Sequence, residues 1–297
     1  MSDKVSSREA GGRPARVRPP PGPSLSGYAA GELDAARAAL AGDDLHEGVH
    51  QARKALRRAR AALALGDGIL GPGAGLIDRE LREINEGLST LRDAHALVET
   101  LDRLIRRERH AGRRAVLDRA RADAVRARDE HADGAVLLDP GLRGRIALID
   151  VLQAALPVLT WDRLTPSALR MGLADSDDRT LDARERALAS GKDKDWHRWR
   201  RRARRASQQR RALAAVGVKA PAATHGFDKR TTERLGEAQD LSLLLAHCGR
   251  GSPFSKDDRL ALRAHAQPAL ERLRRRISRR VAEQAQRLSE GLNDPIT

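Results

Sequence analysis

The sequence predicts an all-α protein built from two related helical halves that arose by internal duplication and are arranged about a pseudo-twofold axis. Hydrophobic residues make up 40% of the chain but aromatic residues only 2%, so Leu, Ala, Val and Ile must form the core. Abundant Ala, Leu, Arg and Glu with few β-branched residues favour helix. No alternation of period two extends beyond a few residues, and a basic motif occurs twice.

The first half of the chain is predicted to contain four helices after a disordered tail. Residues 1–26 are rich in Arg, Pro and Gly, and we expect them to form a basic tail without regular structure. A helix is expected over residues 28–40, and Asp43 or Asp44 can cap a second that ends at the glycines of 66–75. The third and fourth are expected over the ranges 76–101 and 103–131. Whether the third breaks near Asp93 stays open.

The second half is predicted to contain five further helical stretches. They span residues 142–159, 166–190, 195–216, 227–247 and 256–288. We therefore expect one ordered domain over 27–290, with halves at about 27–134 and 139–290, and a short tail over 291–297.

The second predicted helix carries an unusual cationic face. Residues 50–60 hold five Lys or Arg and no acid. His50, Arg53 and Arg57 follow the helical spacing of one face, together with Lys54 and Arg58. Like charges at this spacing cost roughly 0.2–0.5 kcal/mol per pair, so acids or an anionic ligand must compensate them.

The same pattern returns 147 residues later. His-x-x-Arg-Lys-x-x-Arg-Arg at 50–58 recurs as His-x-x-Arg-Arg-x-x-Arg-Arg at 197–205, and the same offset aligns 88–93 with 235–240 and Arg82 with Lys229. Residues 192–211 hold ten Lys or Arg against two Asp, more than half of the net charge of the chain. Three matches at one offset indicate duplication.

Charge and composition narrow the class of function. The net charge of +15 and a pI near 11.1 predict a polyanionic partner such as nucleic acid, an anionic membrane or polyphosphate. The sequence has no apolar run of signal-peptide or membrane-spanning length, so we expect a cytoplasmic protein. The single cysteine, Cys248, excludes an internal disulfide framework.

The duplicated His-x-x-Arg-Lys/Arg-x-x-Arg-Arg helix, with Leu-x-x-Leu-Arg-Asp at 88–93 and Leu-Gly-x-x-x-Asp at 235–240, resembles the CHAD family, the conserved histidine α-helical domain. The resemblance covers roughly residues 28–290. It implies two four-helix bundles around a basic central cavity or pore that binds inorganic polyphosphate. Some members carry an N-terminal CYTH domain, but this chain has no Glu-x-Glu-x-Lys motif, so we expect a stand-alone CHAD protein.

The resemblance also implies which residues line that cavity, namely His50, Arg53, Lys54, Arg57, Arg58, Arg82, His197, Arg200, Arg201, Arg204, Arg205 and Lys229. Ser89 departs from the family pattern where glycine would stand. Arg202 is a cation without a mate, because it aligns with Ala55. Arginine suits polyphosphate because its planar fork donates paired hydrogen bonds to phosphate oxygens.

Several of these residues also fit other roles. His50 and His197 could instead be core or capping histidines, and each cationic helix could be a solvated face that pairs with acids. His46 and His50 lie one turn apart, but two ligands do not close a metal site, so no metal or other cofactor is expected. Asp93 and Asp240 are predicted to support the arginines and not to catalyse a reaction. Trp196 and Trp199 are predicted core residues.

The leading hypothesis is therefore a non-enzymatic cytoplasmic protein that binds inorganic polyphosphate, with an association with polyphosphate granules. The alternative is a nucleic-acid-binding protein that uses the same Arg-rich helices, although few aromatics are present for stacking and no DNA-binding motif is evident. A third reading, a phosphohydrolase, would require catalytic groups that the sequence does not show.

Overall fold

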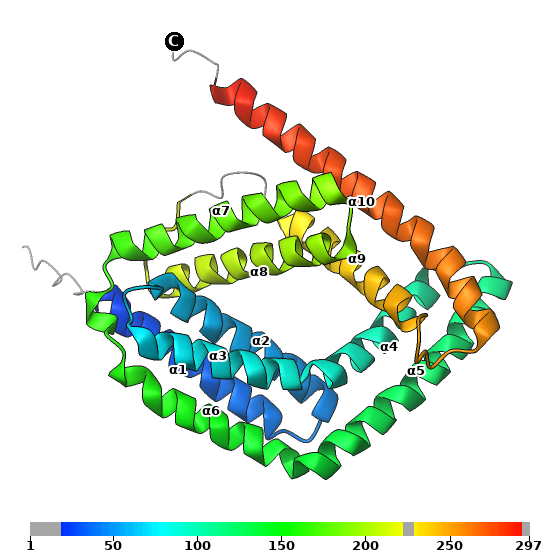
Figure 1. The fold of residues 1–297 in the computed structure, drawn as a ribbon, viewed down its shortest axis with the longest axis horizontal. Helices are drawn as coiled ribbons and strands as arrows, with labels where there is room; N and C mark the ends of the chain where they lie inside the picture. Colours follow the sequence, from blue (N-terminus) through cyan, green and yellow to red (C-terminus); the bar gives the residue numbers. More distant parts are fainter. Residues whose placement is uncertain (1–18, 222–228, 293–297) are drawn as a thin grey trace, which may run out of the picture.

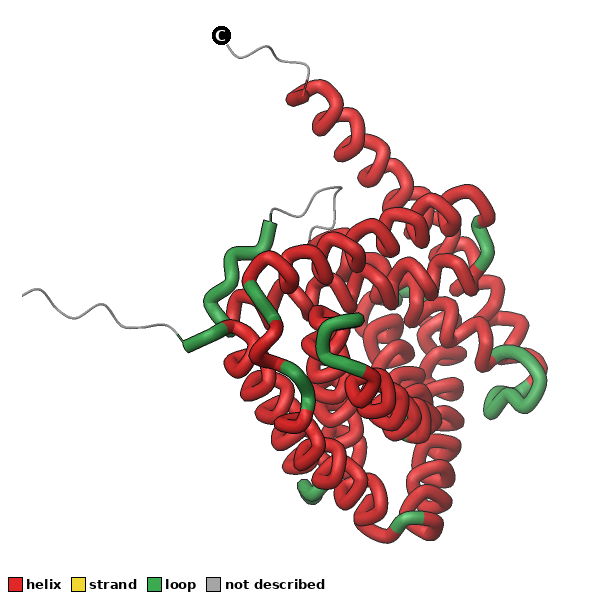
Figure 2. The backbone as a smooth tube through the Cα atoms, turned by 60° about the vertical axis from the view of Figure 1, so that its left-hand side comes forward, coloured by secondary structure: helices red, strands yellow, loops and turns green. Residues whose placement is uncertain are grey.

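The computed structural model describes residues 19–221 and 229–292, and within these ranges the all-α prediction is confirmed. Helices and loops account for the described chain, and no strand occurs in it (Figures 1 and 2). The first helices are α1 (Pro21–Leu40), α2 (Leu45–Leu63), α3 (Pro72–Gly87), α4 (Ser89–Arg107) and α5 (Ala111–Leu138). They are followed by α6 (Arg143–Ala155), α7 (Pro166–Ser190), α8 (Asp193–Ala215), α9 (Lys229–His247) and α10 (Lys256–Leu292).

Helix α1 begins at Pro21, so the predicted tail of 1–26 extends too far; residues 1–18 lie outside the described range. Prolines are compatible with the first helical turn because its N–H groups have no intrahelical partner. Gly22 packs against the 3₁₀ turn η4 (Trp161–Arg163), where a Cβ on the glycine would lie 1.8 Å from the Trp161 carbonyl oxygen. This long-range contact places the first turn of α1, and local sequence does not reveal it.

Two other helix limits differ from the expected ones. The stretch predicted over 76–101 breaks at Leu88, which has φ −91° and ψ 0° and separates α3 from α4. Residues 103–107 end α4, and α5 starts at Ala111 and continues through Asp133 and Gly134. The chain turns later, where Gly141 and Leu142 adopt positive φ angles of 62° and 54°.

The helices pack as hairpins around a central ring. Helix α1 packs on α2, α4 on α5, α7 on α8 and α9 on α10. Inside these hairpins, α2 contacts α8, α8 contacts α9, α9 contacts α4 and α4 contacts α2. Figure 1 shows these four helices around the middle of the molecule.

Two hydrophobic cores hold this arrangement together. The first joins α1, α2, α3 and α6 with the start of α7 and the end of α8. The second joins α5, α9, α10 and most of the buried face of α4 with the end of α7 and the start of α8. Helices α7 and α8 thus contribute to both cores, which do not follow the two predicted sequence halves.

The tryptophans of α8 belong to the second core. Trp199 is fully buried and Trp196 is 6% exposed, which confirms the predicted core role of both residues. Their rings lie 5.3 Å apart, and the guanidinium of Arg274 on α10 lies 5.2 Å from the Trp196 ring.

Among the described residues, no helix has the length and apolar character needed to cross a bilayer. The internal duplication stays a prediction.

Candidate functional site

Helix α2 presents one face of the candidate site, and its first turn sets the register. The Asp44 carboxylate accepts hydrogen bonds from the backbone N–H groups of His46 and Glu47, both at 3.0 Å. Such a cap satisfies donors that a helix start leaves free. Gly48 lets α2 lie close to α1, because a Cβ on it would be 2.3 Å from the carbonyl oxygen of Ala39.

Arginines from three helices meet inside the ring and form what we call the arginine cluster. Its members are Arg53 and Arg57 of α2, Arg92 of α4, and Arg200 and Arg204 of α8. Each side chain is half-buried. The charges of other members lower the pKa values of Arg57 and Arg200, so the arginines of the cluster repel one another electrostatically.

Burial and mutual repulsion weaken proton binding in this cluster. Burial lowers the pKa of Arg57 to about 9, with further contributions from the charges of Arg204 and Arg53. Burial and the charge of Arg204 lower the pKa of Arg200 to about 10, although Asp240 acts in the opposite direction. A group is shifted in this way when desolvation and like charges both disfavour its charged form.

The cluster has few carboxylate partners. Within the described ranges, no ion pair reaches Arg53, Arg57, Arg200 or Arg204, and the Nε atoms of Arg53 and Arg57 are buried without a hydrogen-bond partner. Arg53 donates to the backbone carbonyl of Asn85. Because buried charges are normally paired, the surplus of positive charge indicates a site for an anion.

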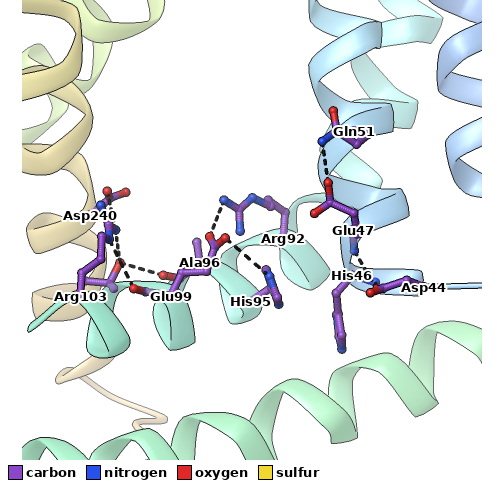
Figure 3. A network of polar contacts seen from close by, with 11 residues as sticks. Asp44, His46, Glu47, Gln51, Arg92, His95, Ala96, Glu99, Arg103 and Asp240 are labelled. Atoms are coloured by element: carbon purple, nitrogen blue, oxygen red, sulfur yellow. Dashed lines mark hydrogen bonds and ion pairs between the residues drawn. The ribbon is translucent and has the colours of Figure 1, made fainter. Parts of the chain in front are cut away.

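The fifth member, Arg92, is better compensated. Its Nη2 atom lies 2.7 Å from the carboxylate of Glu99, and the imidazole of His95 lies 3.7 Å from the same carboxylate (Figure 3). Arg92 was not among the predicted site residues, although it is the arginine of the Leu-x-x-Leu-Arg-Asp motif. That motif was the available signal for it.

The two predicted supporting acids act differently from each other. Asp240 accepts a hydrogen bond from Arg103 at 2.7 Å (Figure 3). Arg103 also donates to the hydroxyl of Thr100 at 3.0 Å. Asp240 raises the pKa of Arg204 against the effect of burial. Asp93 is exposed, and its charge opposes the lowered pKa values of Arg53 and Arg200.

Several predicted lining residues have ion-pair partners or surroundings that differ from those of the cluster. Arg58 pairs with Glu32 of α1 at 3.3 Å, and Arg82 pairs with Glu86 on its own helix at 3.6 Å. Arg205 lies 3.8 Å from Asp78 of α3, which Arg60 already holds at 2.9 Å. Arg201 is exposed and Lys54 half-buried. Lys229 is the first residue of α9, and its side chain lies outside the described part.

The two predicted histidines have different surroundings. His50 is half-buried, and burial followed by the charge of Arg92 lowers its pKa. His197 Nδ1 lies 2.7 Å from Oε1 of Gln239 on α9. Since that oxygen only accepts, the Nδ1–H of His197 is the donor. Gln239 was missed although it lies in the motif at 235–240, where the repeat offset aligns it with Arg92.

His46 stacks on His95, with ring centroids 5.1 Å apart and an angle of 13° between the planes. Across the described ranges, no group of three or more His, Cys, Asp or Glu side chains is arranged to hold a metal ion. Two pockets of the described structure are lined by residues outside the arginine cluster. One lies between α7 and η1 (Ala64–Gly66), and the other lies between the α3–α4 junction, α5 and α6.

The ring of four helices and its shared arginine cluster define a helical protein with an internal polycationic site. The family model of the CHAD domain matches residues 27–249. The chain therefore belongs to the CHAD family, as its duplicated basic motif suggested. The match ends before α10.

Solved structures share this fold. One is PptA from Streptomyces chartreusis, with 20% identity and a TM-score of 0.61 over 90% of this chain and 100% of that one. Another is the CHAD domain from the plant Ricinus communis, with 19% identity and a TM-score of 0.54 over 96% of this chain and 93% of that one. At these identities the likeness concerns the fold. No curated protein matches the chain.

Proposed function

We propose that the protein binds inorganic polyphosphate at the arginine cluster. The observation that carries this proposal is the set of four guanidinium groups, from Arg53, Arg57, Arg200 and Arg204, that have no carboxylate partner within the described chain. A chain of phosphates offers repeated charge and oxygen acceptors from several sides. It would compensate all four cations at once, whereas a single carboxylate would not.

Polyphosphate fits this site better than nucleic acid does. A single-stranded nucleic acid is usually held by aromatic side chains on which its bases stack. The three tryptophans Trp161, Trp196 and Trp199 are at most 6% exposed, so none of them offers a face to a base. The arginines also come from three helices around a centre, while duplex DNA presents its phosphates on a convex surface.

We infer that the site binds its ligand without cleaving it. Asp240 is engaged by Arg103 and Asp93 is exposed, so neither carboxylate is paired with a nucleophile as general acid-base catalysis requires. Binding without turnover would suit a protein that attaches to polyphosphate granules or organises them. A constant polyphosphate length over hours of incubation with protein and divalent cations supports this inference, and shortening contradicts it.

A titration with polyphosphates of graded length against triphosphate, ATP and duplex DNA at fixed ionic strength tests the proposal. We expect long chains to bind tightest and to displace DNA at far lower concentration than DNA displaces them. The opposite order would favour the nucleic-acid alternative.

A paired variant locates the site. Arg57→Glu combined with Arg204→Glu should abolish polyphosphate binding with helical content unchanged. Arg109→Glu with Arg163→Glu is the matched control, because it reverses the same charge at two exposed positions. Equal losses in both variants would mean that net charge alone, and not the cluster, attracts the ligand.

A further inference from the structure

A second basic site lies outside the ring, between α7 and η1. The pocket there has a volume of about 370 Å³, within the range of about 300–1,000 Å³ that is usual for small-molecule sites. Its long wall is the face of α7 that contains Ala168, Met171 and Asp175 and ends at Arg179, and Arg205 of α8 closes the same end. Gly172 brings the two walls together, since a Cβ on it would lie 2.4 Å from the Leu65 carbonyl oxygen.

The Arg179 end of the pocket has surplus positive charge. Burial lowers the pKa of Arg202, and its charged neighbours, Arg179, Arg201 and Arg198, lower it further. No ion pair reaches Arg179 or Arg202 within the described residues. The guanidinium of Arg205 lies 3.8 Å from the carboxylate of Asp78, which Arg60 contacts more closely, at 2.9 Å. Three cations thus meet with one distant carboxylate among them.

Two of the cations near this end, Arg198 and Arg202, stand outside the repeated motif. Arg198, Arg201, Arg202 and Arg205 follow the i, i+3, i+4, i+7 spacing of a single helix face, which is distinct from the face of Arg200 and Arg204. At the repeat offset, Arg198 and Arg202 align with Gln51 and Ala55, so the first copy has no corresponding charge. Compensation of the central ligand therefore does not explain them.

The remainder of the pocket is uncharged or acidic. Ile69 and Ala168 offer apolar surface, as does Met171, which is 67% exposed, and the side chain of Ser167 offers a hydroxyl. Asp67 and Asp175 add negative charges, and Asp175 lies one helical turn from Arg179. A long polyanion along α7 would meet this carboxylate. A molecule with one anionic end and a neutral, hydrogen-bonding body would meet it without repulsion and could donate hydrogen bonds to it.

We propose that this pocket is a second ligand site, which takes a small phosphorylated molecule with an uncharged body, of the nucleoside phosphate class. The phosphate groups bind Arg179 and Arg205, and the nearby Arg202 adds its positive charge. The body lies over Met171 and Ile69, and its hydroxyl or amino groups donate to Asp175. This site is separate from the arginine cluster, so it stands or falls independently of polyphosphate binding.

Calorimetric titration of the full chain with ADP, and separately with inorganic phosphate, tests the site. We expect one ADP per chain, bound about tenfold more tightly than phosphate because the body adds contacts. ADP should bind equally well to the Arg57→Glu/Arg204→Glu variant, in which the central cluster is disabled. Phosphate binding as tight as that of ADP, or loss of ADP binding in this variant, would overturn the proposal.

Variants of the pocket residues test where the ligand binds. Arg179→Glu combined with Arg202→Glu should weaken ADP at least about tenfold, as expected when charge-assisted hydrogen bonds are lost, and should leave long-chain polyphosphate within about twofold. Arg186→Glu, an exposed position on α7 outside the pocket, is the control and should change neither affinity. Met171→Glu should weaken ADP more than phosphate. Unchanged ADP affinity in the double variant, or polyphosphate displacing ADP one for one from this pocket, would contradict the assignment.

Discussion

The Nη2 atom of Arg103 on α4 lies 2.7 Å from Oδ2 of Asp240 on α9. This ion pair joins positions 137 residues apart in the sequence. It engages a carboxylate that was predicted from the sequence to support the arginines of the site. Asp240 therefore acts on Arg200 and Arg204 through its charge, because no hydrogen bond joins it to either of them in the described structure. It opposes the positive potential that attracts an anion.

Replacing Asp240 by Asn should consequently strengthen polyphosphate binding. The substitution removes one negative charge near two arginines of the cluster, which corresponds to about threefold to tenfold in affinity at low salt. Calorimetric titration measures this change in affinity. Glu237→Gln is the control, since Glu237 is one turn away and only 3.9 Å from the exposed Arg107. Weaker binding of Asp240→Asn would instead assign Asp240 the positioning role that we first predicted.

The salt dependence of binding should report how many phosphates the protein contacts. For single-stranded polyanions, the slope of log affinity against log salt is about −0.7 per neutralised charge. Six to eight contacts, as expected for the predicted lining residues, would give a slope between roughly −4 and −6. If only the four unpaired arginines contact the ligand, the slope should be about −3. Affinity that does not change with salt would exclude the electrostatic account.

Two neighbouring arginines of α2 should affect stability in opposite directions. Arg57 is a half-buried cation without an ion pair in the described chain, so Arg57→Gln should raise the free energy of unfolding by about 1 kcal/mol while weakening polyphosphate binding. Arg58 pairs with Glu32, whose side chain is 12% exposed, so Arg58→Gln should lower the free energy of unfolding by about 1–3 kcal/mol. Urea unfolding without ligand measures both. Destabilisation by Arg57→Gln would show that an unseen partner compensates it.

The sequence was sufficient to predict the helices that carry the cluster. The helix predicted over residues 195–216 corresponds to α8, which carries Arg200 and Arg204. These two arginines lie near Arg53 and Arg57 of α2, as the repeated motif predicted, because its spacing gives both the helical period and the residues on one face. The same repeat did not show which cations would be neutralised. Arg58 and Arg205 share the motif, but acids on α1 and α3 reach them, and only the tertiary packing brings Glu32 and Asp78 there.

Helix ends depended on long-range packing in the same way. The glycine and prolines at 21–23 predicted irregular chain, yet the close contact of Gly22 with Trp161 accompanies an earlier start of α1. The helix predicted to end at residue 131 continues as α5 through Gly134 to Leu138. Isolated turn residues are weak signals when neighbouring helices supply packing.

Acidification should destabilise the free protein and strengthen its complex with polyphosphate, and His50 should contribute to both effects. Burial, followed by the charge of Arg92, lowers the pKa of His50 below its usual 6.5, while Glu99 and Glu47 act in the opposite direction. The unfolded chain then binds more protons than the folded one, so this contribution to stability is present above pH 6.5 and is lost as pH falls through that value. His46, His95 and His247 have pKa values lowered in the same direction and act alike.

A phosphate chain near His50 would stabilise the imidazolium and raise its pKa, so binding should take up protons at pH 6 and affinity should rise between pH 7 and pH 5.5. Calorimetry in buffers of different ionisation enthalpy measures the uptake. His50→Gln should reduce the uptake, and His110→Gln, at an exposed position before α5, should not. Undiminished uptake in His50→Gln would mean that His50 does not contact the ligand and that its role is structural.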